Sequence, residues 1–108
     1  MTNLTHIENI VCDGVNKALG GLKGYGEPVT RENVYKGSTR VPLCVSVARQ
    51  FCYLVMHDMY HVSYSKIAKR SEHSTRSVIA GVAKARELLF IDEIYKAIYS
   101  LIRERLGC

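Results

Sequence analysis

Apolar residues recur at spacings of three and four along most of the 108-residue chain, and no segment of four or more residues alternates cleanly between apolar and polar. Residues 5–19 place Ile7, Val11 and Val15 on one helix face, and residues 42–57 form the longest periodic segment. This spacing is that of an α-helix, whereas strands repeat every two residues. The sequence therefore predicts an all-α fold of five or six helices.

Capping residues, glycines and prolines mark the expected ends of these helices. Thr5 and Glu8 have the spacing of a capping box, and Pro42 suits the first turn of a helix because its missing N–H costs nothing there. The expected elements are a helix at 5–19, a loop at 20–28, a turn capped by Thr30 that ends at Gly37, a central helix at 42–57, a break at 58–62, a short helix capped by Ser63 or Ser65, a turn at 70–74, a longer helix through Val78 to Leu89, and a last helix capped by Asp92. The expected inward residues are Leu43, Val47, Phe51, Leu54 and Val55 in the central helix and Ile94, Ile98, Leu101 and Ile102 in the last.

The composition is that of a chain that folds without a stabilising metal ion or disulfide. Hydrophobic residues make up 47% and charged residues 23%, and the length is that of one domain, residues 1–108. No apolar run approaches the roughly 18 residues of a membrane span, so we expect a cytoplasmic protein with no membrane partner. Cys12, Cys44, Cys52 and Cys108 lack the spacing of a zinc or redox site and are expected to be reduced thiols. The sequence predicts no cofactor and no metal.

The formal net charge of +5 is concentrated in one part of the chain. Residues 31–86 hold ten basic and three acidic side chains, whereas the remainder is slightly acidic. A segregated positive charge attracts a polyanion such as nucleic acid. Ordinary solvated helix faces explain the same charge equally well, so charge alone does not decide the function.

Residues 63–86 have the pattern of a helix-turn-helix, which is a short helix, a tight turn and a longer helix. Ala68 is small where the second helix must approach, and Val78, ten residues later, is expected to enter the core. This arrangement turns outward Ser74, Thr75, Arg76 and Ser77, followed along the same outer region by Ala80, Gly81 and Lys84. Hydroxyls and an arginine at a helix N-terminus suit the base edges and phosphates of a major groove. A capped helical hairpin without DNA-binding function is the structural alternative.

These residues resemble a known family. Ala48-Arg49-Gln50, Ser63, Lys66-Ile67-Ala68, Val78-Ile79 and Lys84 together resemble the C-terminal DNA-binding domain (domain IV) of the bacterial replication initiator DnaA, in the Trp repressor-like helix-turn-helix group. The resemblance implies binding to double-stranded DNA in replication control or transcription regulation, with other replication proteins as candidate partners. The sequence has no G-x-x-x-x-G-K-[ST] loop, so the initiator's ATPase activity is not expected.

Two registers align the family's recognition helix, which opens with D-H-T-T-V. If Val78 matches the valine, residues 74–77 replace D-H-T-T and the turn is one residue shorter. If residues 72–75 match instead, Arg76 takes the place of the core valine. We favour the first register, because burying an unpaired arginine costs several kcal/mol.

The predicted DNA-binding residues lie in the loop, the central helix and the helix-turn-helix. Lys36 and Arg40 correspond in place to the family's basic loop, which lies beside the backbone and minor groove. Arg49, one turn after Val45, is expected off the apolar stripe, as a phosphate contact or in a structural salt bridge. The full set is Lys36, Arg40, Arg49, Lys66, Lys69, His73, Ser74, Thr75, Arg76, Ser77 and Lys84. Arg76 is the expected base-reading residue, with a phosphate contact or a pair with Glu72 as the alternatives.

Other functions are less well supported. The same surface suits a protein-interaction module that docks an acidic partner, or a mimic of the initiator. No nucleophile elbow or pair of acids at motif spacing indicates an enzyme. His57 and His61 have a metal-binding spacing only if they are helical, and a surface pair is far commoner. The sequence indicates neither a DNA target nor an oligomeric state.

Overall fold

Five α-helices and one π-helical segment form the ordered framework of the protein in a computed structural model, which describes residues 3–20, 28–37 and 41–107. The elements are α1 (Leu4–Leu19), α2 (Leu43–Leu54), the π-helical segment η1 (Val55–Met59), α3 (Tyr64–Ser71), α4 (Thr75–Ile91) and α5 (Glu93–Leu106). No strand occurs in these described ranges. The predicted all-α fold is confirmed.

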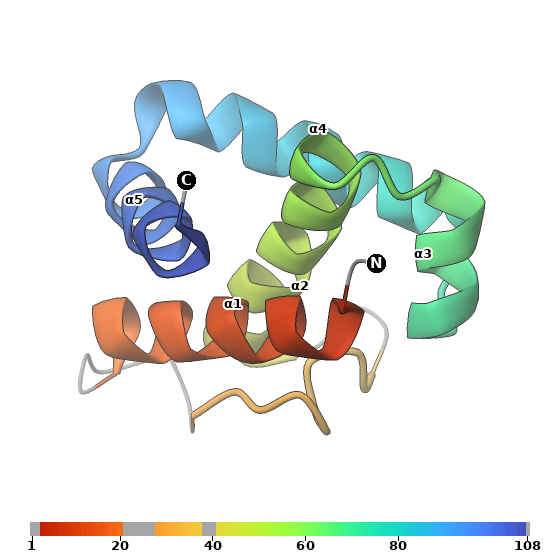
Figure 1. Ribbon diagram of the computed structural model, residues 1–108, viewed down its shortest axis with the longest axis horizontal. Helices are drawn as coiled ribbons and strands as arrows, with labels where there is room; N and C mark the ends of the chain where they lie inside the picture. Colours follow the sequence, from red (N-terminus) through yellow and green to blue (C-terminus); the bar gives the residue numbers. More distant parts are fainter. Residues whose placement is uncertain (1–2, 21–27, 38–40, 108) are drawn as a thin grey trace.

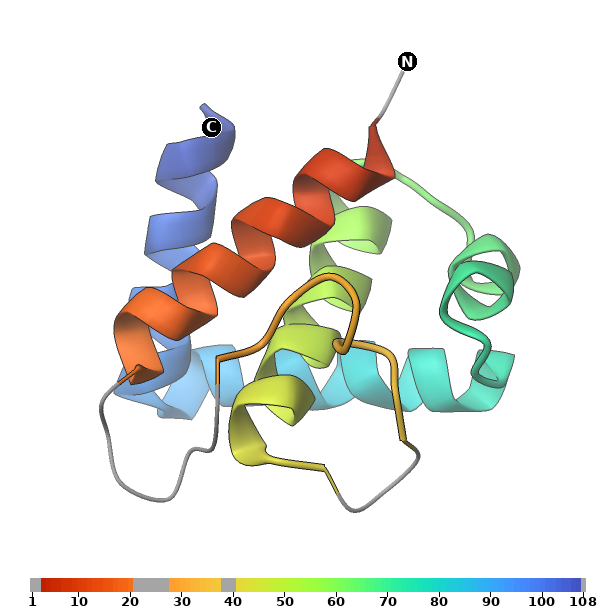
Figure 2. The ribbon, with the colours of Figure 1, turned by 90° about the horizontal axis from the view of Figure 1, so that it is seen from below.

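Helix α2 lies at the centre of the molecule. α1 and α4 pack against it, α5 contacts both α1 and α4, and α3 packs against α4 at the opposite end of the molecule from α5 (Figure 1). Seen from below, the segment of residues 28–37 runs across α2 (Figure 2). The core is continuous and includes the fully buried Phe51 and Leu54 of α2 and Met56 of η1. Other elements therefore enclose α2 on nearly every side.

Two predicted caps are confirmed, and a third cap that was not predicted occurs at Ser74. The Ser63 side chain accepts the Lys66 N–H at the start of α3, and Asp92 Oδ1 accepts two N–H groups at the start of α5. Ser74 Oγ accepts the Ser77 N–H at the start of α4. Each of these oxygens satisfies an N–H that has no partner within the helix.

The predicted capping box of the first helix is wrong. Asn3 is the N-cap, and its Oδ1 accepts the His6 N–H. Glu8 is instead 1% exposed and forms an ion pair with Arg70 of α3. A charged partner 62 residues away decides the position of this carboxylate, and a local pattern does not contain that information.

Smaller differences occur at helix ends. Pro42 precedes α2 as its N-cap and does not lie in its first turn, and the helix continues into η1 up to Met59. Leu43 and Ile94 were expected inward but are 46% and 42% exposed. Both lie in the first turn of a helix and line the same groove. Leu101 is half-buried.

The described cysteines are thiols in the core. Cys12, Cys44 and Cys52 are buried and free, as expected, and burial raises the pKa of Cys52 well above its usual value. A neutral buried thiol acts as a small apolar side chain. Cys108 lies outside the described residues. Within the described chain, no helix is long and apolar enough to cross a membrane.

Candidate nucleic-acid interface

The turn between α3 and α4 is short and its geometry is closely defined. Glu72 has a left-handed backbone conformation, φ 61°, and the following His73 N–H donates to the Ala68 carbonyl of α3. Ala68 is 7% exposed, and Val78 is completely buried. Val78 therefore enters the core as predicted, and the alternative that places Arg76 in the core is wrong.

The buried Val78 turns the start of α4 outward. Arg76 lies two residues earlier, about 200° around the helix, and all four residues from Ser74 to Ser77 are exposed as predicted. Ala80 and Ala83 continue the outward row one and two turns later and are also exposed. Small side chains at these positions leave the helix surface open to a close approach.

Gly81 differs from its prediction. It faces α2, and a Cβ atom at this position would lie 2.9 Å from Cδ2 of Tyr53. The closest approach of α4 to α2 therefore requires glycine here, and Gly81 does not belong to the outer region. Lys84 is exposed and borders a groove beside α2.

The structure separates the cations that are available from those already engaged. Arg70 binds Glu8, and Arg86 binds Asp58, each through Nε and Nη2. Among the predicted DNA-binding residues, the exposed cations that form no ion pair with any described carboxylate are Lys36, Lys66, Lys69, Arg76 and Lys84. Lys17 of α1 and Arg103 of α5 share this property. The alternative in which Arg76 pairs with Glu72 is thus not seen. The five predicted cations lie on the segment of residues 28–37, on α3 and on α4.

The segment of residues 28–37 is fastened to the core at its beginning. The Asn16 side-chain amide donates to the Val29 carbonyl at 2.7 Å and accepts the Val29 N–H at 2.8 Å. The Tyr35 ring stacks on Tyr53, with 6.1 Å between ring centroids. Residues 31–35 form turns, in which Val34 N–H donates to the Thr30 carbonyl. The segment ends at Gly37, whose φ of +81° favours glycine.

Arg49 lies off the apolar stripe of α2 as expected, about 200° around the helix from Val47, but it is buried against the segment of residues 28–37. It is 9% exposed, and its guanidinium donates from Nε to the Val34 carbonyl at 2.9 Å and from Nη2 to the Lys36 carbonyl at 2.7 Å. Its contact with phosphate stays a prediction.

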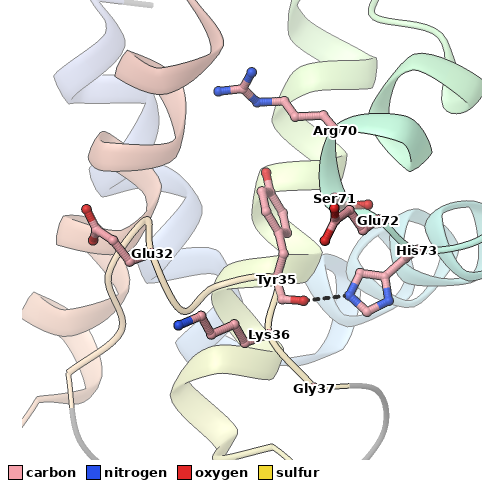
Figure 3. Close-up of a pocket in the computed structure, with 8 residues that line it drawn as sticks. All are labelled: Glu32, Tyr35, Lys36, Gly37, Arg70, Ser71, Glu72 and His73. Carbon is pink, nitrogen blue, oxygen red and sulfur yellow. Dashed lines mark hydrogen bonds between the residues drawn. The ribbon is translucent and has the colours of Figure 1, made fainter.

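His73 connects the turn to the same loop. Its Nε2 lies 2.8 Å from the Tyr35 carbonyl oxygen, and both residues line a cavity of about 620 Å³ (Figure 3). The Lys36 side chain points away from His73 in this view. Because Lys36 is exposed and has four rotatable side-chain bonds, the position of its backbone defines the space that its ammonium group can reach. Arg40 lies outside the described residues.

A buried carboxylate joins three parts of the structure. Glu8 of α1 accepts two hydrogen bonds from Arg70 at 2.8 Å and a third from the Tyr35 hydroxyl. Arg70 also donates to Thr5 Oγ1. This hydrogen bonding to Glu8 raises the pKa of Arg70, and burial raises that of Tyr35 above its usual range. The network holds α1, α3 and the loop in one arrangement, and sequence reasoning did not find it.

His57 and His61, the pair with a possible metal-binding spacing, lie in different environments. His57 Nδ1 is 2.9 Å from the Val62 carbonyl, and its ring stacks on Tyr64 at 3.8 Å. His61 has a left-handed backbone conformation, φ 58°, and is exposed. No group of three or more candidate metal ligands occurs among the described residues.

Comparison with protein-family models, with curated proteins and with solved structures finds no match.

Proposed function

We propose that the protein binds double-stranded DNA by placing the N-terminal half of α4 in the major groove. The observation that carries this proposal is the register of α4, in which the buried Val78 leaves residues 74–77 exposed at the helix start. A recognition helix meets base edges mainly with its first turns, and its free N–H groups favour phosphate. The resemblance to the initiator's DNA-binding domain agrees with this function and suggests a role in replication control or transcription.

The distribution of charge supports the same orientation. Lys66 and Lys69 of α3 and Lys36 of the loop are exposed without a carboxylate partner among the described residues. Glu87 lies on the outward face of α4, nearly in line with Arg76, and would repel phosphates. The proposed contact therefore uses about the first three turns of α4, with cations of the neighbouring elements on the phosphates.

Salt dependence tests the proposal against docking of an acidic protein. Each of Lys66→Ala and Lys69→Ala is expected to weaken binding to all duplex sequences alike and to reduce the slope of log affinity against log salt by about one, because each removes one phosphate contact. Fluorescence anisotropy with a random-sequence duplex measures both quantities. Lys96→Ala is the control, since this lysine lies on α5 and pairs with Glu93.

Absence of duplex binding by the parent protein at low salt would reject the proposal and leave the protein-interaction module as the better function. A slope that is the same in the parent and both α3 variants would remove α3 from the interface.

Base reading is assigned to Arg76. Arg76→Ala is expected to relax the preference at one base pair by about 1–3 kcal/mol, because two guanidinium donors match guanine O6 and N7. Sites selected from a random duplex pool by the parent and by the variant provide the comparison. Lys69→Ala is the matched control, since loss of a phosphate contact lowers affinity without changing preference. Unchanged preferences with uniformly weaker binding by Arg76→Ala would show that Arg76 contacts phosphate instead.

A further inference from the structure

Three successive backbone carbonyl groups in the segment of residues 28–37, which we call the loop, accept hydrogen bonds from two side chains outside it. Arg49 of α2 binds the carbonyls of Val34 and Lys36, and His73 of the α3–α4 turn binds the carbonyl of Tyr35 between them. The three distances are 2.9, 2.7 and 2.8 Å. The backbone immediately before Gly37 is therefore fixed by donors that come from outside the loop.

The Arg49 and His73 side chains are suited to hydrogen bonding with the loop and not only to packing. Arg49 is 9% exposed, and an apolar residue would fill the same volume without the cost of burying a charge. Only the planar fork of arginine offers two parallel donors to two carbonyls, which a lysine ammonium does not match. His73 is one residue before the α4 cap, so its bond relates the loop directly to the start of α4.

Lys36, the last of the three residues whose carbonyls are hydrogen-bonded, is exposed and cationic. Lys36 forms no ion pair with a described carboxylate, and it borders the same cavity as His73. A loop that is ordered before binding loses less conformational entropy on association than one that orders on the ligand. The fastening of this backbone thus has a consequence for binding as well as for folding.

We propose that Arg49 and His73 are positioning residues that hold the Lys36 backbone next to the α3–α4 turn, so that the loop and α4 meet one duplex as a single preformed surface. The inference rests on the proposed function. In it, Arg49 acts through the loop backbone, and Lys36 makes the contact with the phosphates.

A double-mutant cycle tests the coupling. Lys36→Ala is expected to weaken binding to a random-sequence duplex at least about fivefold in the parent but less than about twofold when Arg49→Lys is also present, because the displaced loop no longer places Lys36. His73→Phe should reduce the Lys36 effect in the same way, and His73→Gln, which retains a side-chain donor, should restore it. Arg103→Lys and His6→Phe, both at exposed positions on other helices, are the controls. Effects that simply multiply would overturn the inference.

A second measurement uses the protein without DNA. The N–H groups of Val34 and Lys36 donate to carbonyls within the loop, so their hydrogen exchange reports on its order. Exchange of both amides should be at least about tenfold faster in His73→Phe, while that of Val82 in α4 stays unchanged. Unchanged loop exchange would overturn the positioning role even if DNA binds. Faster loop exchange in a protein that binds no duplex would instead reject the proposed function and leave only the fastening of the loop.

Discussion

Val78→Asp is expected to unfold the protein at ordinary temperatures. Val78 is completely buried within the hydrophobic core, and an aspartate there would place a carboxylate in apolar surroundings. The cost is about 5 kcal/mol or more, which equals the whole stability of many small domains. Thermal unfolding followed by circular dichroism measures the effect.

The neighbouring residue gives a matched control. Ile79 is the next residue in α4 but is 44% exposed. Ile79→Asp should therefore lower the free energy of unfolding by less than about 1 kcal/mol. Similar melting temperatures for the two variants would contradict the register of α4, and with it the assignment of Arg76 as an outward residue.

The register itself could be predicted from the sequence for a simple reason. Only one of two alignments avoids burying Arg76, and the energetic difference between a buried valine and a buried arginine is large. The outward position of residues 74–77 then follows from helix geometry alone. The caps at Ser63 and Asp92 were predictable on similar grounds, because the oxygen and its N–H partner lie within three residues.

Interactions between distant parts of the chain could not be predicted. Glu8 has the spacing of a capping residue, but Arg70 provides a stronger, charge-assisted partner. Arg49 binds carbonyls of a loop whose path depends on the packing of Asn16 and Tyr53 against it. Such side-chain to backbone bonds have no periodicity, so nothing in the local pattern indicates them.

The separation of structural from available cations also required the structure. Arg70 and Arg86 lie in the basic segment, yet both are engaged with carboxylates of distant elements. Arg49 is engaged with the loop. The arginine fork suits such fixed partners, whereas the exposed lysines of α3 stay in solvent. The positive charge of the segment therefore overstates the charge that a ligand meets, and Arg76 is the exception among the arginines of this segment that the structure describes.

Arg70→Ala is expected to lower the free energy of unfolding by about 3 kcal/mol. Glu8 is 1% exposed, so loss of the guanidinium leaves a buried carboxylate with the Tyr35 hydroxyl as its remaining described partner. The value is at the lower end for an uncompensated buried charge, because the Arg70 side chain is itself 33% exposed and water can take part of its place. Urea unfolding measures the difference.

Arg86→Ala is the control that isolates burial as the cause. Arg86 also binds its carboxylate through two nitrogens, but the Arg86 and Asp58 side chains are 48% and 31% exposed. An ion pair in solvent contributes less than about 1 kcal/mol, so this variant should remain close to the parent. Adding Glu8→Gln to Arg70→Ala should recover part of the loss, because a neutral amide costs less to bury than a carboxylate. Equal destabilisation by Arg70→Ala and Arg86→Ala would show that the Glu8 network contributes no more than a surface pair, and that α1, α3 and the loop are held together by apolar packing alone.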